Sequence, residues 1–223
     1  MRRISILTFC AAFLLLMTTG CPSFSTLTTA ETVGEGETDV TLSTSLLGLG
    51  ATADVTDETG EETAAGSSGS IPTFEIGVRH GITEDLDLGA KIFPIGAGFD
   101  MNYAFINNSD FSMSVNPSVS ITRFGGGGES FSYGFGFINL LADVVKTDIM
   151  NLTFGLKPGV FYAAAGGQGD VMPVVGGMGG LDLAISDTFS VMPHFDIVLP
   201  ISNFGSESVG SLTFYNAGLA FHF

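Results

Sequence analysis

Apolar and polar side chains alternate along most of the chain after residue 38. The clearest stretch is 111–122, where mostly apolar residues at odd positions alternate with Ser, Asn and Thr at even positions. Successive side chains of a β-strand point to opposite faces, so each such stretch predicts a strand with one apolar and one polar face. We count ten of these stretches, at about 39–50, 71–80, 86–95, 97–106, 111–122, 131–137, 152–162, 170–184, 189–199 and 209–223.

The connections between these segments alternate in character. Short turns follow the second, fourth, sixth and eighth segments, whereas most of the others are longer or rich in glycine. Residues 52–70 are predicted to form an acidic loop that is too polar to pack, and that serves solvation or gathers divalent cations. Prolines inside the segments predict bulges or strand ends and leave open a count of roughly 8–12 strands; they are Pro117, Pro158, Pro173 and Pro193.

The apolar face of these segments is predicted to meet lipid. Mean hydropathy is +0.43, yet no run after the first 20 residues is long and apolar enough for a membrane helix. The polar face is mostly Ser, Gly, Asn and Thr, whereas a soluble sheet blunts its exposed surface with Lys, Glu and Arg. This pattern favours a membrane barrel with a polar interior over the alternative of a soluble β-sandwich.

The charge balance excludes several partners. Two of the seven basic residues, Arg2 and Arg3, precede the apolar run at the amino terminus, so five remain against 23 acidic residues. Nucleic-acid phosphates and anionic lipid headgroups would be repelled by this balance. The two cysteines, Cys10 and Cys21, lie in or beside the amino-terminal apolar run, and no disulfide is expected.

The amino terminus has the pattern of a secretion signal, with two arginines followed by an apolar run over 4–17. The sequence Thr18-Thr-Gly-Cys21 that follows resembles a bacterial lipobox, although Thr18 stands where that family prefers Leu. The resemblance implies a signal peptide over 1–20, lipidation of Cys21 and a lipidated tether over 21–38, followed by a barrel over 39–223. The alternative is ordinary signal-peptidase cleavage, with Cys21 unmodified.

Residues 213–223 alternate up to a final phenylalanine, and this stretch resembles the terminal strand of bacterial outer-membrane β-barrels. The resemblance implies an all-β, transmembrane, antiparallel up-and-down barrel of about ten strands, monomeric, with both termini in the periplasm. Its partners would be outer-membrane lipids, lipopolysaccharide and the barrel-assembly machinery, which reads the terminal strand. Residues 71–89 also resemble a hairpin of uncharacterised outer-membrane barrel families and imply no activity. The residues of the assembly signal are Tyr215, Leu219, Phe221 and Phe223.

Charged residues on the polar face of the second and third segments predict ion pairs inside the barrel. If Val78 lies opposite Leu88, then Arg79 lies opposite Asp87, and by the same register Glu75 lies opposite Lys91. Opposite charges in directly facing positions stabilise a sheet by about 0.2–1 kcal/mol. These pairs either fill a narrow lumen or set the selectivity of a pore.

The remaining candidates for the lumen are polar residues on the same faces: Asp100, Asn116, Lys157, Asp182, His194, Asp196 and Asn216. His194 and Asp196 share a face, as in acid–histidine chemistry, but no G-x-S-x-G motif accompanies them. The glycine runs at 125–128 and 176–180 lack the lysine and helix of a phosphate loop. We therefore expect no enzyme, no cofactor and no metal site.

Three functions follow in order of preference. The first is an outer-membrane barrel lipoprotein with a lumen filled by side chains and a structural, surface or adhesive role. The second is a narrow pore or a transporter for small or apolar solutes. A barrel enzyme is the distant third.

Overall fold

The computed structural model describes residues 23–56, 62–126, 129–165, 168–201 and 212–223. These residues form eleven strands, and none of them lies in a helix long and apolar enough to cross a membrane. The strands are β1 (Thr38–Thr56), β2 (Glu62–Thr83), β3 (Leu86–Phe93), β4 (Gly96–Asn107), β5 (Ser112–Gly126), β6 (Glu129–Thr147), β7 (Met150–Leu156), β8 (Gly159–Ala165), β9 (Gln168–Ser186), β10 (Phe189–Pro200) and β11 (Leu212–His222).

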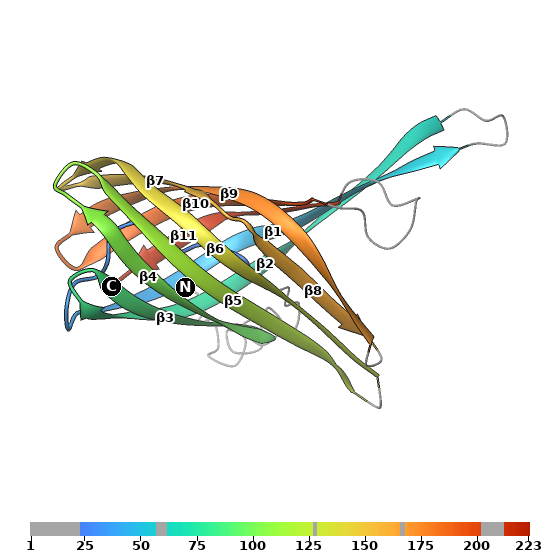
Figure 1. Cartoon of the computed structure of the whole chain (residues 1–223), viewed down its shortest axis with the longest axis horizontal. Helices are drawn as coiled ribbons and strands as arrows, with labels where there is room; N and C mark the ends of the chain where they lie inside the picture. Colours follow the sequence, from blue (N-terminus) through green and yellow to red (C-terminus); the bar gives the residue numbers. More distant parts are fainter. Residues whose placement is uncertain (1–22, 57–61, 127–128, 166–167, 202–211) are drawn as a thin grey trace, which may run out of the picture.

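The strands close into an antiparallel barrel (Figure 1). β7 and β8 together make one strand of the wall, because both pair with β6 on one side and with β9 on the other. The wall therefore has the ten strands that the alternation predicts. β11 pairs with β1 as well as with β10, and Val40 and Phe223 exchange backbone hydrogen bonds at the closure.

Pro158 accounts for the break between β7 and β8, since a proline cannot donate a hydrogen bond to a neighbouring strand. Lys157, which precedes it, still exchanges both backbone hydrogen bonds with Gly176, at 2.9 and 3.0 Å. The wall is therefore continuous at the break, and the Lys157 side chain is wholly buried in the lumen.

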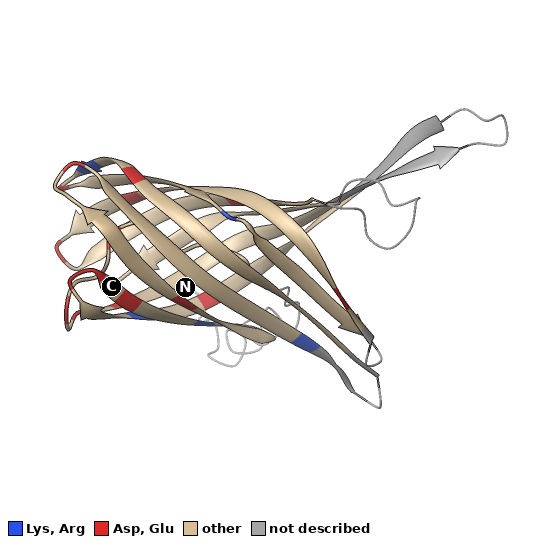
Figure 2. Cartoon of the chain, viewed as in Figure 1, with Lys and Arg blue, Asp and Glu red and all other residues tan. Residues whose placement is uncertain are grey.

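The outer surface of the barrel is apolar. Large side chains at alternate positions are exposed on every wall strand, among them Ile92 at 60%, Phe99 at 63% and Leu156 at 62%. Figure 2 shows acidic residues gathered at the short turns that join β2 to β3, β4 to β5, β6 to β7 and β9 to β10. We call the end of the barrel formed by these four turns the short-turn end. An apolar band with charge confined to its ends is the surface of a membrane-spanning barrel.

At the opposite end, long strands replace the loops that the sequence predicts. The backbone of 52–56 pairs with 62–66 in a hairpin arm that extends beyond the barrel, where an unpaired acidic loop was expected (Figure 1). β5 and β6 likewise stay paired as far as Gly126 and Glu129, through part of the glycine run. The backbone can form these extensions whatever its side chains, because strand pairing needs only backbone groups.

The outward parity predicted for β6 is wrong. Tyr133, Phe135 and Phe137 point into the barrel and are at most 9% exposed, whereas Ile138 and Leu140 face outward. Serine and glycine occupy the outward positions beside the buried rings. Alternation separates the two faces of a strand but does not show which face points inward. In β6 the larger side chains fill the lumen.

The register predicted for β2 and β3 is shifted by two residues. Val78 pairs with Ala90 and Arg79 with Gly89, with an irregularity between Gly81 and Thr83. A shift of two keeps every side chain on its predicted face, since the side-chain period is also two. The charged side chains therefore still point into the lumen, as diagonal neighbours.

Candidate functional site in the lumen

Residues 23–33, which we call the plug, lie inside the barrel. The sequence predicts this stretch as a polar tether with little to bury, but Ser23, Phe24, Ser25 and Thr26 are at most 6% exposed. The plug is not a strand, and it runs from the middle of the lumen towards the short-turn end, where β1 begins. The tether prediction fails because the polar groups of this stretch bond to the barrel wall.

A turn at residues 34–37 carries the chain from the lumen into the wall. Gly34 and Gly36 have φ angles of +85° and +77°, which residues with a Cβ rarely adopt. Gly36 donates to the carbonyl of Gly81 and Gly81 donates to that of Glu37, both at 3.0 Å. A side chain at position 81 would collide with the Gly34 carbonyl, so the turn lies directly against β2.

Three carboxylates of the wall accept hydrogen bonds from backbone N–H groups of the plug. Asp196 on β10 accepts from Thr26 at 3.3 Å, and Asp87 on β3 accepts from Val33 at 3.2 Å. Between them, Asp143 on β6 accepts from Ala30 and Glu31 at 3.0 and 3.1 Å. The carboxylates thus bind the plug along most of its length.

Cations and an amide of the wall donate to the carbonyls of the plug. The ammonium groups of Lys91 and Lys157 lie 2.7 Å from the Ser25 carbonyl and 2.6 Å from the Phe24 carbonyl, respectively. Asn102 donates to the carbonyls of Thr29 and Glu31. Buried backbone groups must be paired, and here wall side chains do what a neighbouring strand would otherwise do.

The predicted ion pairs occur in the lumen and extend beyond two partners. The Lys91 ammonium lies 3.3 Å from the Glu75 carboxylate, which also accepts from the Ser25 hydroxyl of the plug. Arg79 bonds to Asp87 and to Asp100 on β4, and Asn116 donates to Asp100 at 2.9 Å. These groups tie β2, β3, β4 and β5 together across the inner face.

Lys157 and Asp196 form a fully buried ion pair at 2.5 Å, in contact with the plug through Thr26. His194 lies beside them, with Nδ1 3.5 Å from the second oxygen of Asp196. Neither ring nitrogen of His194 makes a hydrogen bond to a described residue, and the same holds for the amide of Asn216. The plug therefore covers the pair of His194 and Asp196, and the Asp196 carboxylate binds the plug.

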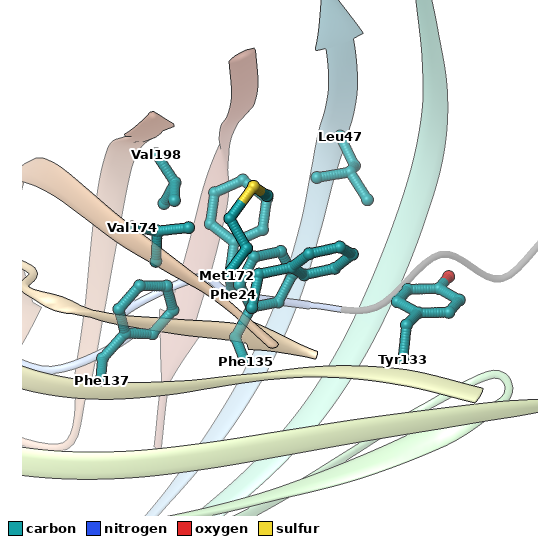
Figure 3. Close-up of a cluster of buried hydrophobic side chains, with 9 residues drawn as sticks. Phe24, Leu47, Tyr133, Phe135, Phe137, Met172, Val174 and Val198 are labelled. Atoms are coloured by element: carbon teal, nitrogen blue, oxygen red, sulfur yellow. The ribbon is translucent and has the colours of Figure 1, made fainter. Parts of the chain in front are cut away.

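Aromatic side chains fill the lumen beyond the polar zone, away from the short-turn end. The cluster comes from β1, β6, β8, β9 and β10 together with the plug (Figure 3), and Phe214 of β11 packs against it. We call it the aromatic cluster; its buried members are Phe24, Leu47, Tyr133, Phe135, Phe137, Phe161, Met172, Val174 and Val198. The alternation of the sequence predicts a uniformly polar lumen, so this zone was missed.

A large vestibule and a much smaller cavity border the plug. A vestibule of about 810 Å³ opens at the short-turn end, and Asp182, also expected in the lumen, lies in its lining. The vestibule ends against Leu27, Thr28 and Thr29 of the plug. Between the plug and the wall of β2 to β6 the free volume falls to about 50 Å³. The plug therefore separates the vestibule from the aromatic cluster.

Some predicted features lie elsewhere. The signal peptide and Cys21 are outside the described residues, as are the side chains of the acidic stretch 54–62. In the terminal strand, Leu219 and Phe223 are 42% and 54% exposed on the outer surface, while Tyr215 and Phe221 are partly covered.

Replacing Asp143 by alanine is expected to destabilise the protein by about 2–4 kcal/mol, because buried donors would lose their acceptor. Besides the two plug N–H groups, the carboxylate accepts from Asn151 at 3.0 Å and from Thr153 at 2.6 Å. Urea unfolding in lipid vesicles measures the loss. Asp148→Ala, the same change at an exposed turn, is the control, and equal stability of the two variants would contradict the assignment.

No family model and no curated protein matches the chain. Among solved structures, the outer-membrane protease OmpT of Escherichia coli is 10% identical with a TM-score of 0.49, covering 89% of this chain and 100% of that one. Neisserial surface protein A is 9% identical with a TM-score of 0.38, and the match covers 82% of this chain and 95% of that one. Ail of Yersinia pestis is 12% identical with a TM-score of 0.37, and the match covers 85% of this chain and 99% of that one. Likenesses this distant carry no argument about activity.

Proposed function

We propose that this protein is a bacterial outer-membrane barrel closed by its own amino-terminal segment, with a structural or surface role and no catalytic one. The observation that carries the proposal is the matched set of wall groups around the plug. Acceptors at Asp87, Asp143 and Asp196 meet its N–H groups, and donors at Lys91 and Lys157 meet its carbonyls.

The outer membrane is the compartment that suits the exterior. A closed barrel has no free sheet edge, and its apolar outer faces need lipid to cover them. The secretion signal and the terminal strand support the same compartment, with both termini in the periplasm. Lipidation at Cys21 remains part of this proposal.

A water-filled pore is the less favoured alternative. The plug and the charged network occupy the cross-section, and ten strands enclose little further room. The described lumen accordingly narrows from the vestibule to a space for one or two waters beside the plug. Catalysis is disfavoured because His194 and Asp196 are buried beneath the same segment.

Single-channel recording in planar bilayers tests the closed state. The purified full-length protein is expected to stay silent, whereas steady openings of the unmodified protein would overturn the proposal. Fractionation of cell envelopes tests the compartment: the folded barrel is expected with the outer membrane, and recovery in the inner membrane would contradict that assignment.

A further inference from the structure

We propose that the aromatic cluster is a binding site for a small, neutral aromatic molecule, and that the Phe24 side chain occupies this site in the closed state. The proposal goes beyond a closed barrel, because it assigns a ligand class to the lumen. It stands on the composition of the lumen, on the geometry around Phe24 and on the way the plug is held.

The lumen of a membrane barrel is usually polar, and this one is polar only in part. Towards the long strands, six wall strands contribute apolar side chains to the interior, among them Phe135, Phe161, Phe214 and Met172. Lipid cannot reach these side chains, so they do not serve the membrane-facing surface. If nothing covered it, this contiguous apolar surface would mark a binding surface.

The Phe24 side chain covers this apolar surface. Its ring comes from the plug, whereas the other rings of the aromatic cluster come from the wall. Its centroid lies 5.3 Å from that of Phe135 and 6.4 Å from that of Phe214, with interplanar angles of 57° and 75°. Tilted and edge-on arrangements at these distances are the ones that aromatic pairs prefer. The wall thus forms a seat with the size and geometry for one aromatic ring.

The seat also distinguishes aromatic from aliphatic occupants. The Lys157 ammonium lies 5.7 Å from the centroid of Phe24 and 5.0 Å from that of Phe137. A cation at this distance over a ring face is attracted by the π electrons, which a saturated ring lacks. Because Lys157 already neutralises Asp196, the seat offers no counter-charge to an ionic ligand.

The occupant can be exchanged without opening the wall. No described residue of the plug pairs with a strand. The ladders that form the barrel all join wall strands to one another, and the β1–β11 ladder closes it. The contacts of Phe24 and its neighbours with the wall are made by side chains such as Lys157, Lys91 and Asp196. A segment outside the sheet can open locally while the sheet stays folded. A ligand that takes the seat would therefore displace Phe24 and loosen the plug.

Binding of toluene to the folded full-length protein tests the seat. Phe24→Ala should bind toluene at least about tenfold more tightly than the unmodified protein, because removal of the ring leaves an apolar cavity, and such cavities take up benzene-like molecules. Leu27→Ala is the matched control, because Leu27 is a plug residue that packs on a separate cluster with Leu141, Met178 and Met192. Phe24→Ala should also prefer toluene to methylcyclohexane, and Lys157→Met should reduce that preference.

Equal binding by Phe24→Ala and Leu27→Ala, or no preference for the aromatic ring, would overturn the proposal. A second measurement keeps Phe24 in place: toluene should accelerate maleimide labelling of Thr26→Cys, a buried plug position that does not line the vestibule. The proposal would also be overturned if the labelling rate of the plug cysteine did not change at toluene concentrations that saturate Phe24→Ala. If Phe24→Ala does not fold, toluene is added up to its solubility limit instead. Either failure leaves the closed barrel standing, because conductance tests that state separately.

Discussion

Replacing residues 23–33 by a Gly-Ser sequence of equal length is expected to turn a silent barrel into one that conducts ions. The replacement keeps the backbone N–H and C=O groups of the plug but removes its apolar side chains, including Phe24 and Leu27, which pack in the lumen. A flexible polar chain keeps the length but gains too little on burial to offset its ordering. The ten-stranded wall stays closed, because none of its ladders involves the plug.

Single-channel recording in planar bilayers measures this effect. The unmodified protein provides the silent reference, and a Gly-Ser replacement within the exposed turn 108–110 controls for the substitution itself. Heat-modifiable migration on gels shows whether each variant has folded. A folded variant with the replaced plug that remained silent would show that wall side chains alone close the lumen.

Removing one partner of the Lys157–Asp196 pair is expected to cost about 3–5 kcal/mol, because it leaves an uncompensated charge in the lumen. Both side chains are wholly buried, and both also hold the plug at Phe24 and Thr26. Lys157→Met and Asp196→Leu should each destabilise strongly, whereas the double variant should lose less than either single variant. Replacing both charges removes the unpaired group as well as the attraction.

Urea unfolding of the two single variants and the double variant in vesicles forms the required cycle. Asp187→Leu, at the exposed turn that precedes β10, provides a control for the loss of an acidic residue. Strictly additive losses would mean that the two charges do not depend on each other, contrary to their 2.5 Å contact.

The outer face was predictable because lipid imposes one simple rule at every strand. In β5, Val119 and Ile121 are both 55% exposed, while Ser114 and Asn116 are buried inside, as the alternation predicts. The charge pairs of β2 and β3 also came into contact despite a register error of two residues. Long charged side chains reach a diagonal neighbour as well as a direct one.

The plug was not predictable in the same way, because its partners are remote in sequence. Thr26 bonds to a residue 170 positions away and Ala30 to one 113 positions away. Read alone, a stretch of Ser, Thr and Glu has little apolar surface to bury and suggests a solvated linker. Asp143, an inward carboxylate with no lysine or arginine partner among the described residues, is the kind of residue that signals a missing donor.

The aromatic zone left a weak signal in β6. The apolar parity changes within this strand, from the odd positions of Phe135 and Phe137 to the even positions of Ile138 and Leu140. A strand whose outer face meets lipid throughout would keep one parity. The change marks the level at which the lumen, and not only the outer surface, becomes apolar.

Maleimide labelling of a single cysteine in the plug tests whether residues 23–33 fill the lumen. Thr26→Cys, which is buried and does not line the vestibule, should react at least roughly 100-fold more slowly in the folded protein than in urea, since reaction requires release of the plug. Glu37→Cys, on the exposed turn beyond the plug, should react quickly in both, and the unmodified chain gives the background from Cys10 and Cys21. If Thr26→Cys reacts as quickly as Glu37→Cys in the folded protein, residues 23–33 lie outside the lumen and do not close the barrel.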